Sequence, residues 1–263
     1  MAPLLTIQDL SVAGRLGPFN AEVFAGERLH LIGPNGAGKS TLLSCMAGLQ
    51  PAQGKITFAG QALTSWTPQM LARLRAFCPQ QQLPPFSQPL WHFLSLHQSQ
   101  LDDEGLADIA GALGLADKLN RSVNALSGGE WQRARLAAVL LQVDPRLNAE
   151  GRLLLLDEPF NNLDVAQQAA LDSLLDKLSQ RGLAIVLSSH DLNHTLHHAQ
   201  RVWLMQDGNL AMCGEPKLVV KPENLRKVWD LSFHMVEAEG QHFILVPGAD
   251  PGLPAQAWEA KLP

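Results

Sequence analysis

One nine-residue stretch constrains the fold of this chain more than any other. It reads Gly33-Pro34-Asn35-Gly36-Ala37-Gly38-Lys39-Ser40-Thr41 and fits the pattern G-x-x-x-x-G-K-[ST] at every fixed position. Residues 28–32 before it, which include Leu29, Leu31 and Ile32, predict a short strand, and residues 42–47 after it have a helical pattern. Strand, loop and helix in this order form the setting in which such a loop binds an anion.

The residue types of the loop suit a chain of phosphates. Glycines let the backbone turn its N–H groups inward, and the positive end of the following helix points to the same place. Lys39 supplies a mobile charge for the terminal phosphates, and the Ser40 hydroxyl can ligate Mg²⁺. The sequence therefore predicts a site for ATP and Mg²⁺. The alternative, a glycine-rich turn before an ordinary helix, does not account for the motifs downstream.

Two strongly apolar stretches end in polar residues. Residues 153–156 are four leucines, as expected of a strand covered on both faces of a parallel sheet, and Asp157 and Glu158 follow them. We expect Asp157 to hold Mg²⁺ and Glu158 to polarise a water molecule for attack on the terminal phosphate. Residues 183–189 form a similar stretch, and His190 follows at the end where open α/β sheets bind ligands.

A second predicted helix start also suits an anion. Ser127 precedes Gly128 and Gly129, and apolar residues at helical spacing continue to Val143. Ser127 and Glu130 match a capping box, but a capping box does not call for two glycines in the first turn. We interpret the segment as a second set of backbone and hydroxyl donors for an anion.

Composition excludes several classes of function. The net charge of −5 argues against a nucleic-acid partner, and no run reaches the 18 apolar residues that a membrane-spanning helix needs. Cys45, Cys78 and Cys213 are widely spaced and form no C-x-x-C pair, so we expect buried thiols in a reducing compartment. These features predict a cytoplasmic protein, whose membrane part, if it serves a membrane process, is another chain.

Four histidines after the second strand raise the question of a metal. His190, His194, His197 and His198 repeat on one helical face. We expect no cysteine or carboxylate to complete a metal site with them. We therefore interpret residues 194–198 as a polar helix face.

Together the motifs resemble those of the ATP-binding cassette (ABC) family of transport ATPases, from about Leu4 to about Asn209. The resemblance rests on their order and spacing: a Walker A motif at residues 33–40, a Q-loop at Gln80, a signature at 126–130, a Walker B motif at 153–158, a D-loop at 161–164 and an H-loop at His190.

The resemblance implies an α/β fold. It would be a P-loop NTPase (RecA-like) core with a mostly parallel sheet, an N-terminal antiparallel β subdomain and an inserted α-helical subdomain. The cassette would span residues 1–240, with the core in 1–82 and 146–240, the helical subdomain in 83–145 and a C-terminal tail in 241–263.

The resemblance also implies residue roles. Two cassettes would dimerise head to tail, so that Ser127, Gly128 and Gly129 of one copy close on the ATP held by the Walker A motif of the other. Glu158 would be the catalytic base and His190 would contact the γ-phosphate. Gln80 would sense Mg²⁺ and the membrane subunit, and Asp164 would link the two sites.

The same likeness implies partners and a location. Two transmembrane permease subunits would bind the cassettes, a periplasmic substrate-binding protein would act indirectly, and the pair would lie on the cytoplasmic face of the bacterial inner membrane. One departure is that the family usually stacks adenine on an aromatic residue before the Walker A motif. This chain has no tyrosine, and we expect Arg15 or apolar packing to meet the base.

Stretches outside the motifs resemble one branch of the family, the ATPase subunits of vitamin B12 importers. They are residues 16–19, 80–86, 91–94, 146–152 and 188–196. The nearest alternative is an iron-siderophore or haem importer. A non-transport ABC ATPase of translation or DNA repair is more distant, because the chain has one cassette and Ser127 follows Lys39 by only 88 positions. Glu158 argues against a nucleotide-binding module without catalysis.

Overall fold

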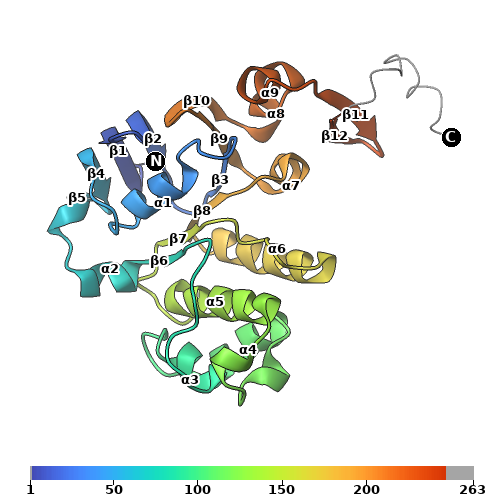
Figure 1. Ribbon diagram of the computed structural model, residues 1–263. Coiled ribbons are helices and arrows are strands. Elements are labelled where there is room, and N and C mark those ends of the chain that lie inside the picture. The colour runs from blue at the N-terminus through green and yellow to red at the C-terminus, as the bar shows by residue number, and fades with distance from the viewer. Residues whose placement is uncertain (1, 247–263) are drawn as a thin grey trace.

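The computed structural model describes residues 2–246, which form two sheets, their covering helices and a terminal hairpin (Figure 1). The smaller of the two sheets is antiparallel and lies near the N-terminus. Its strand order is β2-β1-β4-β5. The strands span Leu5–Val12 (β1), Leu16–Val23 (β2), Gln53–Phe58 (β4) and Gln61–Ala62 (β5).

The central sheet has six strands in the order β10-β9-β3-β8-β7-β6. All neighbours pair in parallel except β9 and β10. The strands span Arg28–Ile32 (β3), Arg75–Cys78 (β6), Leu153–Leu156 (β7), Ala184–Ser188 (β8), Arg201–Gln206 (β9) and Asn209–Gly214 (β10). The predicted mostly parallel core and antiparallel β layer are thus confirmed.

The four leucines of β7 explain why the strand lies in the interior. Leu154 and Leu156 pack into a core shared with helices α5 (Gly128–Val143) and α6 (Val165–Gln180). Leu153 and Leu155 pack into a second core, shared with α1 (Lys39–Met46) and the antiparallel sheet. Successive side chains of a strand point to opposite faces, so an uninterrupted apolar run suits a strand covered on both sides.

Helices make up most of the part between β6 and β7 (Figure 1). This part contains α3 (Leu90–Ser95), α4 (Asp103–Ala112) and α5, and α2 (Pro68–Leu74) precedes β6. Short 3-10 turns lie at residues 63–65, 116–118 and 123–125. The expected inserted helical region is therefore present.

The C-terminal part follows β10. It contains α8 (Pro216–Val219), α9 (Pro222–Trp229) and a hairpin of β11 (His234–Ala238) and β12 (Gln241–Leu245). The side chain of Asn193, on α7 (Leu192–His198), makes hydrogen bonds with the backbone N–H and C=O of Ile244. Of the predicted tail 241–263, residues 247–263 lie outside the described residues. Among helices within residues 2–246, none has the length and apolar character to cross a membrane.

The cysteines follow the prediction only in part. Cys45 and Cys78 are buried, and burial raises the pKa of each thiol to about 11. Cys213 is exposed, so the prediction of burial is wrong there. The reason is that β10 is an edge strand on which residues 209, 211 and 213 point to solvent.

Candidate active site

The phosphate loop leaves β3 and enters α1, whose first residue is Lys39. At two of its glycines, another segment of backbone lies so close that a side chain would not fit. A Cβ at Gly33 would lie 2.3 Å from the carbonyl oxygen of Met205, and a Cβ at Gly38, with φ 94°, would lie 2.9 Å from that of Arg15. A Cβ does not approach a carbonyl oxygen this closely, so the loop can take this course only with glycine there.

Lys39 lies folded over the loop. Its Nζ donates hydrogen bonds to the carbonyl oxygens of Gly33 (2.7 Å) and Pro34 (3.0 Å). Burial lowers the pKa of Lys39, and the negative charges of Glu158 and Asp157 oppose that shift. The ammonium group therefore occupies a site that already faces two carboxylates.

A cavity of about 360 Å³ opens beside the loop. Its lining is mainly polar and comprises Arg15, Asn35, Gly36, Ala37, Gly38, Lys39, Ser40, Thr41, Gln80 and Glu158. An ammonium group, a hydroxyl, carboxylate and amide oxygens and the N–H groups of a helix start suit a triphosphate with Mg²⁺. The residues present thus fit ATP and Mg²⁺, and Arg15 lies where we expect the nucleotide.

Parallel pairing of β6, β7 and β8 brings three predicted residues together. Gln80 follows β6, Glu158 follows β7 and His190 follows β8. The Gln80 Nε2 donates to Glu158 Oε2 at 2.7 Å, and the His190 Nε2 contacts Glu158 Oε1. The carboxyl ends of parallel strands meet at one edge of the sheet, which is why residues 110 positions apart in sequence converge on one carboxylate.

Glu158 has an unusual backbone. Its φ is 51°, in the left-handed region that residues with a side chain rarely adopt. Its N–H donates to Ser188 Oγ at 2.8 Å, and that hydroxyl donates to Asp157 Oδ1 at 2.6 Å. The Ser188 hydroxyl therefore fixes both acidic residues, and strained backbone of this kind occurs preferentially at functional sites.

The sequence reasoning missed Ser188 and Asn161 as site residues. Asn161 Nδ2 donates to Glu158 Oε2 at 2.6 Å, so this amide shares the carboxylate with Gln80. The sequence places Asn161 only in the D-loop. The available signal for Ser188 was its position as a hydroxyl at the end of an otherwise apolar strand.

The signature segment forms the capping box that its spacing predicts. Ser127 Oγ accepts from the N–H of Glu130 at 3.3 Å, and Glu130 Oε2 accepts from the N–H of Ser127 at 2.7 Å. Ser127, Gly128 and Gly129 do not line the cavity beside the phosphate loop of the same chain.

The two glycines of the signature differ in their surroundings. A Cβ at Gly129 would lie 3.2 Å from the carbonyl oxygen of Asn162 in the D-loop, so this close packing explains the glycine. A Cβ at Gly128 would meet no heavy atom within 4 Å among the described residues. At the end of the D-loop, Asp164 caps α6 by accepting from the N–H of Gln167 at 2.8 Å.

Helix α5 also holds the segment that follows β6. Trp131 Nε1 donates to the carbonyl oxygen of Gln82 at 2.7 Å. Arg135 is buried, and its guanidinium donates to the carbonyl oxygens of Pro79 and Gln80. The sequence reasoning missed this role of Arg135, for which a charged residue within an otherwise buried helix was the signal.

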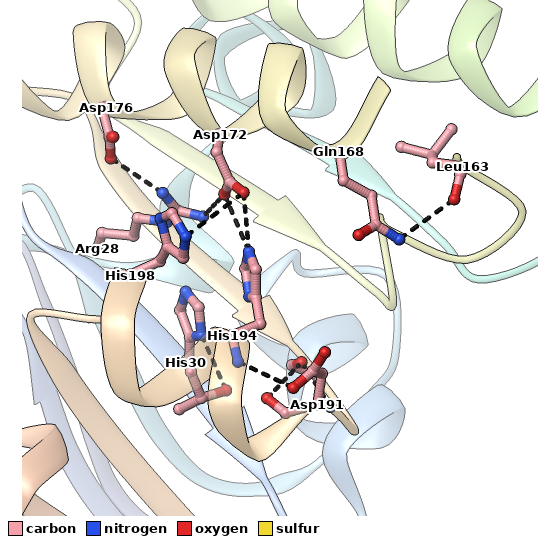
Figure 2. A network of polar contacts seen from close by, with 11 residues as sticks. Arg28, His30, Leu163, Gln168, Asp172, Asp176, Asp191, His194 and His198 are labelled. Atoms are coloured by element: carbon pink, nitrogen blue, oxygen red, sulfur yellow. Dashed lines mark hydrogen bonds and ion pairs between the residues drawn. The ribbon is translucent and has the colours of Figure 1, made fainter. Parts of the chain in front are cut away.

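A second polar cluster lies where α6 and α7 approach β3 (Figure 2). Asp172 of α6 accepts hydrogen bonds from His194 of α7 and from Arg28 of β3, and Arg28 also pairs with Asp176. His198 lies on the same side of α7 as His194, and the two rings stack at 4.6 Å between centroids. The sequence interpretation that no carboxylate accompanies these histidines is wrong, because Asp172 reaches them from another helix.

Comparisons with known proteins agree with this geometry. The sequence profile of the ABC transporter family matches residues 16–161. A Shigella boydii protein, "Vitamin B12 import ATP-binding protein BtuD", is 54% identical over 247 residues, which are 94% of this chain and 99% of the relative. The protein of the same name from Escherichia coli O139:H28 is 54% identical over 93% of this chain and 99% of its own.

Solved structures show the same fold. The ATP-binding subunit of an ABC transporter superposes with a TM-score of 0.75 at 24% identity, covering 86% of this chain and 98% of that one. A bacterial Atm1-family ABC exporter with ATP bound superposes with a TM-score of 0.75 at 22% identity, covering 87% of this chain and 41% of the exporter. With the loop, the converging strand ends and these relatives taken together, the chain belongs to the ABC transporter family.

Proposed function

We propose that this chain is the ATP-hydrolysing subunit of a vitamin B12 importer. The convergence of Gln80, Glu158 and His190 beside the phosphate loop carries the ATPase assignment. The cargo follows from relatives named for vitamin B12 import, which are 54% identical over nearly their whole length. The cargo is not contacted by the ATPase, so that part rests on kinship alone.

The site residues divide the work of hydrolysis. Bound Mg²⁺ would neutralise charge on the phosphates, with Ser40, Gln80 and Asp157 as its protein ligands. Lys39 exchanges its bonds to loop carbonyl groups for bonds to phosphate oxygens. Glu158 takes the proton of the attacking water, and His190 holds the terminal phosphate in line.

A second copy completes each site in this proposal. Ser127, Gly128 and Gly129 lie outside the cavity of their own chain, and Gly128 has free space around it among the described residues. A helix start with its first turn open suits the phosphates bound by another copy. Asp164, next to this surface, then links the two sites of a head-to-tail homodimer.

The Q-loop is suited to connect the dimer with the membrane. Its backbone at Pro79, Gln80 and Gln82 is attached to α5, the signature helix, through Arg135 and Trp131. Closure of the dimer therefore moves the Q-loop.

We assign the cassette to residues 1–240, with the core in 1–82 and 146–240 and the helical subdomain in 83–145. The partners are two permease subunits at the cytoplasmic face of the inner membrane, supplied by a periplasmic substrate-binding protein.

The ATPase assignment is tested by Glu158→Gln. The amide cannot accept a proton, so ATP with Mg²⁺ should shift the variant to a stable dimer in light scattering while phosphate release falls by at least about 100-fold. Glu150→Gln, at an exposed glutamate, is the matched control and should keep wild-type turnover. Phosphate release at the wild-type rate by Glu158→Gln would remove Glu158 from the role of base.

The cargo is tested by transport in cells. Deletion of the gene should abolish uptake of labelled cobalamin, and the wild-type copy, but not the Glu158→Gln copy, should restore it. Unchanged cobalamin uptake together with loss of iron-siderophore or haem uptake would contradict the vitamin B12 assignment. That result would leave the ATPase assignment in place.

A further inference from the structure

Asp172, His194 and His198 form a cluster beside β3 that has the composition of a metal site (Figure 2). The proposed hydrolysis of ATP does not use these three residues. One carboxylate oxygen of Asp172 and one ring nitrogen each of His194 and His198 lie within 4.8 Å of one another. His194 and His198 are four residues apart on α7, so both rings lie on one face of that helix. Asp172 faces them from α6.

The atoms available for ligation can be identified one by one. Arg28 contacts Asp172 Oδ1, and Asp172 Oδ2 lies 3.0 Å from His194 Nε2 and 3.9 Å from His198 Nε2. Two ligand atoms on one ion about 2.0–2.2 Å away lie about 3.3 Å apart in a tetrahedral arrangement. The Asp172–His194 distance is already close to this value, and a movement of the His198 side chain toward Asp172 would bring the three atoms onto one ion.

The surroundings favour a cation. Arg28 forms ion pairs with both Asp172 and Asp176. Its single positive charge neutralises only one of the two carboxylates, so the group of three has a net charge of one negative unit. Arg28 also fixes the orientation of the Asp172 carboxylate, as residues behind metal ligands commonly do. Burial lowers the pKa of His198, although the charge of Asp172 opposes this shift.

Unused polar atoms and a route for entry lie at the same place. His194 Nδ1 is buried with no hydrogen-bond partner among the described residues, as is His30 Nε2 behind it, and the rings of His30 and His194 stack at 5.5 Å. The side chain of His198 is 37% exposed, whereas those of His194 and Asp172 are 12% and 10% exposed. An ion can thus enter past His198 and meet the two deeper ligands.

We propose that Asp172, His194 and His198 form a binding site for Zn²⁺ or a related late first-row divalent ion. Two imidazoles and one carboxylate favour Zn²⁺, Co²⁺, Ni²⁺ or Cu²⁺ over Mg²⁺, which prefers oxygen ligands. This site is separate from the Mg²⁺ position at Ser40, Gln80 and Asp157. The ion joins α6, which begins after the D-loop, to α7, which begins after His190, and so stabilises the position of both loops.

The experiment uses the full chain without an affinity tag, stripped with a chelator and held in excess Mg²⁺ without nucleotide. Titration calorimetry with ZnCl₂ should show one site in the wild type. His198→Ala should weaken that site by at least about tenfold, because even residues behind metal ligands commonly contribute this much. His92→Ala, at an exposed histidine on α3, is the matched control and should bind Zn²⁺ as the wild type does.

A second variant separates ligation from folding. His198→Cys offers a thiolate, so it should retain Zn²⁺ binding and, with Co²⁺, show the charge-transfer absorption of a cobalt–thiolate bond that the wild type lacks. At one fixed Zn²⁺ concentration, Zn²⁺ should also raise the melting temperature of the wild type by more than that of His198→Ala.

Three results would overturn the proposal. The first is wild-type binding no tighter than that of His198→Ala. The second is a loss of binding in His190→Ala with none in His198→Ala, which would place the ion at the nucleotide site. The third is a Co²⁺ complex of His198→Cys without the thiolate band.

Discussion

At the scale of single residues, the Ser188 hydroxyl joins the two acids of the Walker B motif. It donates to Asp157 Oδ1 and accepts from the N–H of Glu158, and the side chain is fully buried. The Asp157 carboxylate and the Glu158 N–H group, which it contacts, both have little access to water. Removal of one hydroxyl therefore leaves a donor and an acceptor unsatisfied, which costs more than a hydrogen bond at the surface.

We expect Ser188→Ala to lower the free energy of unfolding by about 1–3 kcal/mol, the usual cost of unsatisfied buried polar groups. Turnover should fall as well, because the backbone of Glu158 loses its anchor. Urea unfolding and phosphate release measure the two effects. Ser65→Ala, at an exposed serine, is the control. Equal stability of Ser188→Ala and the control would show that this hydroxyl is dispensable.

The cysteines provide a prediction about reactivity. Cys45 and Cys78 are buried with thiol pKa values of about 11, whereas Cys213 is exposed on β10. At pH 8 a maleimide should label Cys213 and leave the other two intact in the native protein, because thiolate and access are both needed. Peptide mass spectrometry locates the label, and unfolding in urea should expose all three. Rapid native labelling of Cys45 or Cys78 would contradict the described packing.

At the scale of elements, α5 combines three tasks. Its first residues carry the signature, Gly129 packs on the D-loop, and Arg135 with Trp131 holds the Q-loop. A rigid helix that contacts both loops makes their movements dependent on one another. Because Ser127 caps this helix, a substitution there can change the stability of the helix as well as the binding of phosphate. A test has to distinguish these two effects.

Ser127→Asp separates them. Aspartate caps helices as well as serine does, so the variant should keep wild-type stability, whereas Ser127→Ala should lose about 0.5–2 kcal/mol. In the proposed dimer the added negative charge would face the phosphates bound by the second copy, so it should abolish ATP hydrolysis. Thermal unfolding and phosphate release are the measurements. Full hydrolysis by Ser127→Asp would contradict a role for this helix start in binding phosphate.

The sequence predicted the elements best where local chemistry determines them. The glycine loop, the leucines of β7 and the capping box of α5 each follow from short-range rules, and the structure confirms all three. The contacts of Asn161, Ser188 and Arg135 depend on which strands and helices become neighbours, so they were not visible in the sequence. The same holds for Asp172, which lies 22 residues before His194 and reaches it only through the packing of α6 on α7.

At the scale of the whole molecule, the proposed head-to-tail dimer would combine two regions that lie apart on one chain. Lys39 lies in the cavity, and Ser127 lies outside it. Copies of Lys39→Ala and of Ser127→Asp should each be inactive alone. Mixed, they should recover part of the hydrolysis, since a mixed head-to-tail pair contains one site with both residues intact. Phosphate release by the mixture measures this, and an inactive mixture that still forms mixed dimers would contradict shared sites.

The order of strands in the central sheet also has a consequence for biosynthesis. The strand that carries the phosphate loop, β3, lies between β8 and β9, which are made more than 150 residues later. While the ribosome is still synthesising the middle of the chain, β3 has neither neighbour, and its five buried residues have no sheet to join. The nucleotide loop can therefore take its final shape only when the chain is nearly complete. We expect a nascent chain released early to lack the sheet that supports the loop and to expose the leucines of the unpaired strand to chaperones.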